Sequence, residues 1–213
     1  YADFVTHSYH PVKHITTGEG GSVLTNSKKI DEKIRMLRSH GILKKFKKNN
    51  LKKKLWYYEM HNLGYNYRIT DFQCALGISQ LSKLDMFIKR RREIAKIYNT
   101  NLNDGNIFTI PEEKKNFKHA YHLYPCQINF EKLKISKTEF FNIMKKNKIN
   151  LQVHYIPIHL QPFYRKNYGF KIGDFPKAEK FYAKEVSLPI YFSLKDNQIY
   201  NIINLIRKFI NKK

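Results

Sequence analysis

Lys13 lies between a short apolar stretch and a glycine-rich turn, where its amine could react with an aldehyde held beside the backbone. The flanking sequence is SYHPV before it and HITTGEGG after it. A primary amine condenses with an aldehyde to a Schiff base, but only in its neutral form, which burial or a neighbouring positive charge favours. A lysine in such a loop can equally be a solvated surface residue. These residues alone leave both interpretations open.

The elements around this lysine are predicted to be two short strands and a helix. Residues 4–6 end one strand, residues 22–25 form the other, and glycines make the turn between them. Asn26 or Ser27 is expected to cap the helix, and Gly41 to end it. The apolar positions of this helix repeat at helical spacing on one face: Ile30, Ile34 and Leu37.

A second, longer helix is predicted to begin at the capping box formed by Thr70 and Gln73. It is expected to restart at Asp85 after a bend, and residues 89–92 are expected to form a solvated, charged face. The residues that we expect to form its buried stripe are Ala75, Leu76, Leu81 and Leu84.

The composition changes near Pro111, after which strands and helices mix differently. Strands are predicted over residues 121–129 and 151–158. Helices are predicted after the capping box of Ser136 and Glu139, with Phe140, Ile143 and Met144 buried, from Pro176 to Val186, and from Asp196 to Ile210. The pattern indicates an α/β part over residues 1–84 and a smaller α+β part over residues 85–213.

The charge of the chain raises the question of nucleic-acid binding. The formal net charge is +23, with 40 basic and 17 acidic residues, yet 32 of the basic residues are Lys and 8 are Arg. Arginine is the better reader of bases and phosphates, so this composition is more typical of solvated positions. We read the densest basic stretch, Lys44–Lys54, as a surface insertion, and expect no specific nucleic-acid partner.

Cellular setting and metal binding are constrained by a few further features. The two cysteines, Cys74 and Cys126, are far apart in sequence and outside any metal-type spacing, which favours a reducing, cytoplasmic setting without a metal site. No stretch approaches the length of a membrane span, so no membrane partner is expected.

Several sequence blocks, taken together, resemble the DegT/StrS-type sugar-nucleotide aminotransferases. The resemblance covers essentially the whole chain, and the form of its blocks is closest to the branch that makes pseudaminic acid precursors. The blocks are SYHPVK with TTGEGG, RSHG, WYYEM, LGYNYR, ALG, HYIP, QPFY and SLP, in that order. The resemblance implies the C-terminal part of an aspartate-aminotransferase-like (fold type I) large domain, followed by a small α+β domain.

The resemblance also implies a cofactor and a set of site residues. The cofactor would be pyridoxal 5'-phosphate, bound covalently to Lys13, which also acts as the general base. Ser8 would bind the cofactor phosphate, and Asn66 would reach the partner's phosphate across a homodimer. The residues that would line the sugar-nucleotide site are His154, Tyr155, His159 and Tyr164.

The implied reaction moves an amino group, usually from L-glutamate, to C4 of a UDP-linked 4-keto-6-deoxy-N-acetylhexosamine. Related branches use other nucleotide 4-keto sugars. A sister class that dehydrates carries histidine at the lysine position, and Lys13 argues against it.

Relatives of this type carry a long segment before the position that matches Tyr1. We therefore expect this chain to be a C-terminal fragment that is inactive and poorly soluble by itself. A basic nucleic-acid-binding protein and a non-catalytic remnant are the alternatives.

Overall fold

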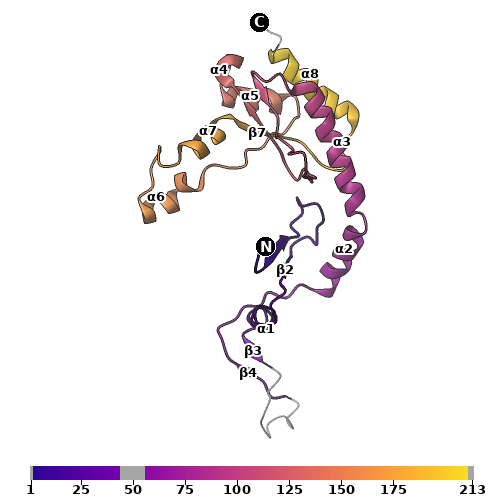
Figure 1. The fold of residues 1–213 in the computed structure, drawn as a ribbon, viewed down its shortest axis with the longest axis vertical. Helices are drawn as coiled ribbons and strands as arrows, with labels where there is room; N and C mark the ends of the chain where they lie inside the picture. Colours follow the sequence, from indigo (N-terminus) through magenta and orange to yellow (C-terminus); the bar gives the residue numbers. More distant parts are fainter. Residues whose placement is uncertain (1, 44–55, 211–213) are drawn as a thin grey trace. The chain divides into compact units, whose positions relative to one another are not determined.

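A computed structural model describes residues 2–43 and 56–210 (Figure 1). Two compact units are present, unit 1 (Tyr1–Leu84) and unit 2 (Asp85–Lys213). The basic stretch Lys44–Lys54, predicted to be a surface insertion, lies outside the described residues.

Unit 1 is built on a small antiparallel hairpin. Its strands pair in the register Ser8↔Gly21 and Val5↔Leu24, so the ends nearest the connecting loop lie opposite each other. A second, shorter pair of strands follows the first helix. The elements of this unit are β1 (Val5–Ser8), β2 (Gly21–Leu24), α1 (Lys28–Leu37), β3 (Ile42–Leu43), β4 (Glu59–Met60) and α2 (Asp71–Leu81).

Both predicted helix caps of unit 1 are confirmed. The side chain of Ser27 accepts a hydrogen bond from the backbone N–H of Ile30 at the start of α1. At the start of α2, Thr70 and Gln73 form the reciprocal capping box. These side chains satisfy N–H groups that have no partner within the helix, which fixes where each helix begins.

The expectation of a buried stripe on α2 is wrong for the described residues. Leu76 is 36% exposed and Leu81 is 56% exposed. The strands of unit 1 are short and no residue of α1 or α2 is buried, so this unit offers little surface against which α2 could pack. Among the described residues, none covers the apolar side chains of α2 well enough to bury them.

Unit 2 contains one three-stranded antiparallel sheet with helices around it. The strand order is β5-β6-β7, and Cys126 of the central strand pairs with Val186 of β7. The helices α3 and α8 lie side by side, and α6 and α7 lie apart from them (Figure 1). The elements are α3 (Leu84–Leu102), β5 (Phe108–Thr109), β6 (Tyr124–Ile128), α4 (Phe130–Leu133), α5 (Lys137–Lys146), η2 (Ile158–Leu160), α6 (Pro162–Tyr168), α7 (Pro176–Lys184), β7 (Glu185–Leu188) and α8 (Asp196–Ile210).

The hydrophobic core of unit 2 lies between its sheet, α3, α5 and α8. Tyr98 and Tyr124 are fully buried with ring centroids 5.0 Å apart, and Phe140 of α5 and Ile203 of α8 are fully buried in the same cluster. The predicted cap of α5 at Ser136 and the predicted bounds of α8 are confirmed.

The expectation of a solvated face over residues 89–92 is wrong at Arg91. This side chain is 6% exposed, and its Nη1 atom donates to the carbonyl oxygens of Tyr121, His122 and Ile190 at 2.9–3.0 Å. Burial lowers the pKa of Arg91. Buried carbonyl groups need a hydrogen-bond donor, and one guanidinium supplies several N–H donors in a fixed geometry. A charged residue therefore occupies a core position here.

Two expectations late in the chain need correction. Residues 151–158 do not form a strand, although Gln152 makes an isolated antiparallel bridge to Ser187. The helix that begins at Pro176 ends at Lys184 rather than Val186, and the next four residues form the buried strand β7. At β7, pairing with the distant strand β6 decides the conformation, which local periodicity does not reveal.

Within residues 2–43 and 56–210, no helix has the length and apolar character needed to cross a membrane.

Candidate functional site

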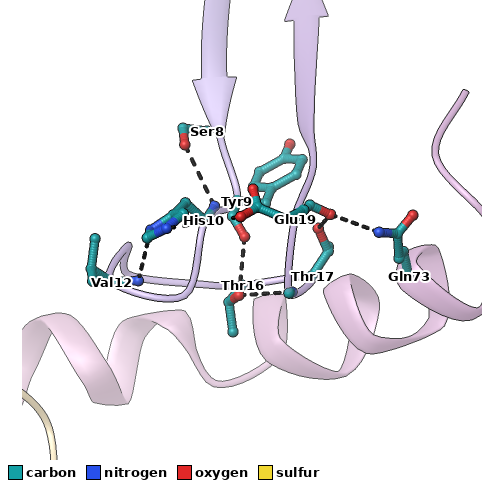
Figure 2. A network of polar contacts seen from close by, with 9 residues as sticks. Ser8, Tyr9, His10, Val12, Thr16, Thr17, Glu19 and Gln73 are labelled. Carbon is teal, nitrogen blue, oxygen red and sulfur yellow. Dashed lines mark hydrogen bonds and ion pairs between the residues drawn. The ribbon is translucent and has the colours of Figure 1, made fainter. Parts of the chain in front are cut away.

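The loop that contains Lys13 connects β1 to β2 (Figure 2). Backbone hydrogen bonds close it. Tyr9 N–H donates to the carbonyl oxygen of Gly20 at 2.8 Å, which extends the hairpin by one residue pair. Tyr9 O in turn accepts from the backbone N–H of Thr17 at 3.0 Å and from the hydroxyl of Thr16 at 3.0 Å. The loop is therefore fixed at both of its ends.

Thr17 is the internal brace of this loop. It is 4% exposed, and its hydroxyl donates to the carbonyl oxygen of Glu19 at 2.7 Å. The same oxygen accepts from the side-chain amide of Gln73 at 3.0 Å (Figure 2). Gln73 also completes the capping box of α2, so one side chain connects the start of that helix to the lysine loop.

Two glycines are required by the path of the chain. Gly18 has a φ of +79°, a left-handed conformation that L side chains rarely adopt. A β-carbon on Gly21 would lie 2.6 Å from the carbonyl oxygen of His7, so no side chain fits there. The glycines predicted to make this turn are thus needed for the tight return of the chain into β2.

Lys13 emerges from a tight turn within the loop and is half-buried. Its backbone N–H donates to the carbonyl oxygen of His10 at 2.9 Å, and the ring of His10 accepts from Val12 N–H at 3.4 Å. The backbone turn that leads into the lysine is fixed, so its side chain starts from a defined Cα position. Such fixed positioning is what a covalent attachment point requires.

Ser8 ends β1 and is exposed. Its Oγ accepts from the backbone N–H of His10 at a long 3.5 Å, which leaves the hydroxyl hydrogen to be donated elsewhere. A hydroxyl that donates at a strand end beside a glycine-rich loop is suited to binding a phosphate oxygen. The structure places it at the end of the strand that leads into the loop of Lys13.

Asn66 lies in another part of unit 1, in a bridge with Ser39. The backbone around it is clamped to the end of α1, because Tyr65 N–H donates to Leu37 O at 2.7 Å and Tyr67 N–H to Arg38 O at 2.9 Å. Its side chain is exposed. It is therefore held on a surface, as a residue that contacts a partner would be.

His154 and Tyr155 lie in unit 2, in the extended segment beside β7. His154 is half-buried, and its Nδ1 atom lies 2.8 Å from Ser187 Oγ. Its backbone N–H donates to Oε2 of Glu185 at 2.9 Å. Tyr155, joined to it by a cis peptide bond, is 72% exposed. The segment thus presents one anchored and one exposed side chain.

His159 is buried against an acidic partner. It is 6% exposed, and its Nε2 lies 2.9 Å from Oε1 of Glu179. The carboxylate also accepts from the backbone N–H groups of Gly173 and Phe175. The hydrogen bond from His159, followed by that from Gly173, lowers the pKa of Glu179. This arrangement favours a role in holding the loop before α7 in place.

Tyr164 lies on α6 in a group of exposed aromatic rings. Its ring stacks on Tyr168 with centroids 5.8 Å apart and meets Phe163 edge-on at 5.3 Å. Phe163 and Tyr168 are each more than 60% exposed. This helix therefore offers an aromatic surface to a ligand or to another chain.

The predicted site residues fall into two sets, one in each unit. Lys13, Ser8 and Asn66 lie in unit 1, whereas the four residues predicted to bind the sugar nucleotide lie in unit 2. Among the residues for which the structure gives positions, no three His, Cys, Asp or Glu side chains are grouped as a metal site would need.

The residues of the hairpin loop fit the phosphorylated aldehyde cofactor that the sequence suggested. Lys13 lies in the loop, Ser8 lies at the end of the strand that leads into it, and Gly21 allows a close backbone approach. These residues thus include one amine and one hydroxyl, the two groups that such a cofactor would need here for a covalent bond and a phosphate contact.

Four supporting residues were not found from the sequence. Thr17 and Gln73 act through hydrogen bonds to a carbonyl oxygen, for which the sequence carries no signal beyond the capping box itself. Glu185 and Ser187 were missed because that stretch was assigned to the end of a helix. The alternation of Glu185 and Ser187 with two apolar residues before Pro189 is the strand pattern that could have revealed them.

Comparison with known sequences matches residues 1–207 to the model of the DegT/DnrJ/EryC1/StrS aminotransferase family. Over 99% of the chain and 54% of the relative, it is 46% identical to the uncharacterized protein MJ1066 of Methanocaldococcus jannaschii. It is 39% identical to a UDP-4-amino-4,6-dideoxy-N-acetyl-beta-L-altrosamine transaminase of Campylobacter jejuni, covering 97% of the chain and 54% of the relative. It is 30% identical to a GDP-perosamine synthase of Escherichia coli, covering 100% and 53%. The chain spans about half the length of these relatives.

Solved structures agree with this match. Helicobacter pylori PseC, described as an aminotransferase involved in the biosynthesis of pseudoaminic acid, superposes with a TM-score of 0.88 at 32% identity, over 100% of this chain and 54% of that one. The PLP form of the putative sugar aminotransferase Spr1654 of Streptococcus pneumoniae superposes with a TM-score of 0.84 at 27% identity, over 99% and 52%. The predicted fold class, part of a fold type I large domain with a smaller α+β domain, is thereby confirmed.

Proposed function

Because the chain belongs to the DegT/DnrJ/EryC1/StrS aminotransferase family, we propose that its protein is a pyridoxal-phosphate-dependent aminotransferase. It moves an amino group from L-glutamate to C4 of a UDP-linked 4-keto-6-deoxy-N-acetylhexosamine, in pseudaminic acid or surface-glycan biosynthesis. The observation that carries this proposal is Lys13, half-buried in a loop that Thr17 braces. The 39% identity to the Campylobacter jejuni transaminase supports the choice of substrate.

In this proposal Lys13 has two tasks. Its Nζ would hold the cofactor covalently until the amine of the donor displaces it, and the freed amine would then be the base that takes the proton from Cα of the amino donor. Pyridoxal phosphate, when bound, supplies the electron sink for this reaction. The backbone turn from His10 to Lys13 fixes the point from which the lysine side chain starts, so that both tasks use the same backbone geometry.

Ser8 and Asn66 are proposed to bind phosphate groups of the cofactor. Ser8 donates its hydroxyl hydrogen within its own subunit. Asn66 donates its side-chain amide to the cofactor of the other subunit in a homodimer, so that each active site is shared across the interface. The exposed position of Asn66 and its clamped backbone support this role.

The four residues of unit 2 are proposed to serve the nucleotide sugar. His154, Tyr155 and Tyr164 would contact it directly, since their side chains are half-buried or exposed. His159 would act through Glu179, by keeping the loop between α6 and α7 in its observed path.

We also propose a domain role for each unit and a cellular setting. Residues 1–84 would belong to the large, cofactor-binding domain, and residues 85–213 would form the linking helix and the small domain. The exposed apolar residues of β1 and β2, among them Val5 and Leu24, support further packing partners for unit 1. Both cysteines are free thiols, which supports a cytoplasmic setting.

The test is an assay of the full-length protein with pyridoxal phosphate, L-glutamate and the UDP-linked keto sugar. The proposal predicts formation of the 4-amino sugar and 2-oxoglutarate in equal amounts. Transamination of a GDP-linked 4-keto sugar alone would instead favour the second candidate, an enzyme of the kind that the similarity to GDP-perosamine synthase suggests. No amino transfer to either sugar would contradict both candidates.

A further inference from the structure

Strand β7 places two buried polar residues on one face, next to His154. Glu185 is 0% exposed and Ser187 is 4% exposed, and residues two apart in a strand point to the same side. The bridge between Gln152 and Ser187 brings the segment that carries His154 alongside the strand. Three side chains from two distant stretches of sequence thus meet inside unit 2.

Hydrogen bonds connect these three residues in a closed ring. Ser187 Oγ donates to Oε1 of Glu185 at 2.6 Å, while Oε2 of the same carboxylate accepts from the backbone N–H of His154 at 2.9 Å. His154 Nδ1 lies 2.8 Å from Ser187 Oγ. Both oxygens of the Glu185 carboxylate therefore accept a hydrogen bond: Oε1 from the side chain of Ser187, and Oε2 from the backbone of His154.

The direction of each hydrogen bond follows from the number of hydrogens. A serine hydroxyl has one hydrogen, and a carboxylate can only accept, so the hydrogen of Ser187 points to Glu185. Ser187 Oγ must then accept from His154, which places the hydrogen of the neutral imidazole on Nδ1. The other ring nitrogen, Nε2, is left as an acceptor.

We infer that Glu185 and Ser187 are positioning residues that fix the tautomer of His154, so that its Nε2 accepts a hydrogen bond from an amide N–H group of the nucleotide sugar. The identity of that ligand rests on the proposed function. We call the hydrogen bonds among Glu185, Ser187 and His154 the relay. Their direction does not rest on the proposed function, because it follows from contacts within unit 2.

The burial of Glu185 supports a specific task for this residue. Placing a carboxylate in a protein interior is costly unless it is paired and hydrogen-bonded. The ammonium group of Lys137, whose pKa is lowered by burial and to a smaller extent raised by the charge of Glu185, provides a positive charge nearby. The Nζ atom of Lys137 donates its hydrogen bond to Tyr182 O at 2.6 Å. The carboxylate of Glu185 accepts its hydrogen bonds from Ser187 and His154.

Glu185→Gln should reverse the relay. A glutamine can meet the backbone N–H of His154 only with its amide oxygen, which turns its NH₂ group toward Ser187 Oγ. The serine then accepts from the amide and donates its own hydrogen to His154 Nδ1. The tautomer changes to Nε2–H, and an amide N–H of the substrate would lose its acceptor.

The experiment is ¹⁵N NMR of the full-length protein labelled at histidine, with His154 assigned by its loss in His154→Gln. We expect the Nδ1–H tautomer in the wild type, Nε2–H in Glu185→Gln, and a mixture in Ser187→Ala. Ser193→Ala, which removes an exposed hydroxyl of the same unit, should change nothing. An Nε2–H tautomer in the wild type, or no change in either relay variant, would overturn the inference.

Kinetics then test the substrate part of the inference. Glu185→Gln should raise KM for the nucleotide sugar by about tenfold, the effect of losing one hydrogen bond, and leave KM for the amino donor unchanged. Equal effects on both substrates would overturn this part. If the tautomers agree but the full-length protein transfers no amino group to any nucleotide sugar, the proposed function fails while the relay stands.

Discussion

A methyl group of Thr17 lies 2.9 Å from the position that a β-carbon would take on Gly77 of α2. Thr17 is thus enclosed by the lysine loop on one side, through its hydrogen bond to Glu19 O, and by the helix on the other. A second contact between the same elements is the hydrogen bond from Gln73 to Glu19 O. The shape of the loop that carries Lys13 therefore depends on a helix that begins more than fifty residues later.

Gly77→Ala should loosen this contact even though alanine favours helices by about 1 kcal/mol. The added methyl group overpacks against Thr17, which costs about 1–3 kcal/mol. Thr17→Ser removes the opposing methyl group and keeps the hydroxyl, so the double variant should recover most of the loss. Urea unfolding of the four proteins in this cycle measures the coupling. Purely additive effects would mean that the two residues do not touch.

Arg91→Leu should destabilise unit 2 by roughly 3 kcal/mol or more, because it removes the donor that serves three carbonyl oxygens. Leucine fills part of the space but leaves those carbonyl oxygens without a hydrogen-bond donor. Arg165→Leu, at an exposed position of α6, is the matched control and should change the free energy of unfolding by less than about 0.5 kcal/mol. Equal effects of the two changes would contradict the assigned role of Arg91.

The pair of Glu179 and His159 should make stability depend on acid. The hydrogen bond from His159 lowers the pKa of Glu179 in the folded state, so the charged form stabilises the fold. That contribution is fully present above the unfolded pKa of about 4.3 and is lost as pH falls through the lower folded value. The difference in unfolding free energy between wild type and Glu179→Gln should therefore shrink below about pH 4. A difference that is constant from pH 7 to pH 3 would contradict this assignment.

Mixing inactive subunits tests the proposed sharing of the site across a homodimer. Lys13→Ala and Asn66→Ala should each be nearly inactive alone. After subunit exchange, about a quarter of the wild-type activity should return, because half of the dimers are mixed and each has one intact site. Recovery should be absent if both changes are placed on the same chain and mixed with Lys13→Ala. No recovery in the first mixture would place Asn66 and Lys13 in the same subunit's site.

The parts of the fold that the sequence predicted are those with local signals. The caps at Ser27, Thr70 and Ser136 depend on side chains three residues or fewer from the backbone group that they bind. The span of α8 follows from its strong apolar periodicity. These features need no knowledge of the rest of the chain.

The parts that the sequence did not predict depend on distant partners. Strand β7 exists because it pairs with β6, about sixty residues earlier, and its charged first residue disguised it as the end of a helix. Arg91 is buried because three carbonyl groups converge on it, which no sequence pattern records. The same holds for the site: the lysine loop is recognisable from its glycines, but its brace at Thr17 and the relay behind His154 are visible only in three dimensions.

The most direct test of the central claim is borohydride reduction of the full-length protein with pyridoxal phosphate, followed by peptide mass spectrometry. The proposal predicts one stable pyridoxyl modification, on Lys13, and its loss together with transamination in Lys13→Arg. Lys29→Arg, at an exposed position of α1, should keep both. A modification on another lysine, or a Lys13→Arg protein that still transaminates at the wild-type rate, would contradict the claim.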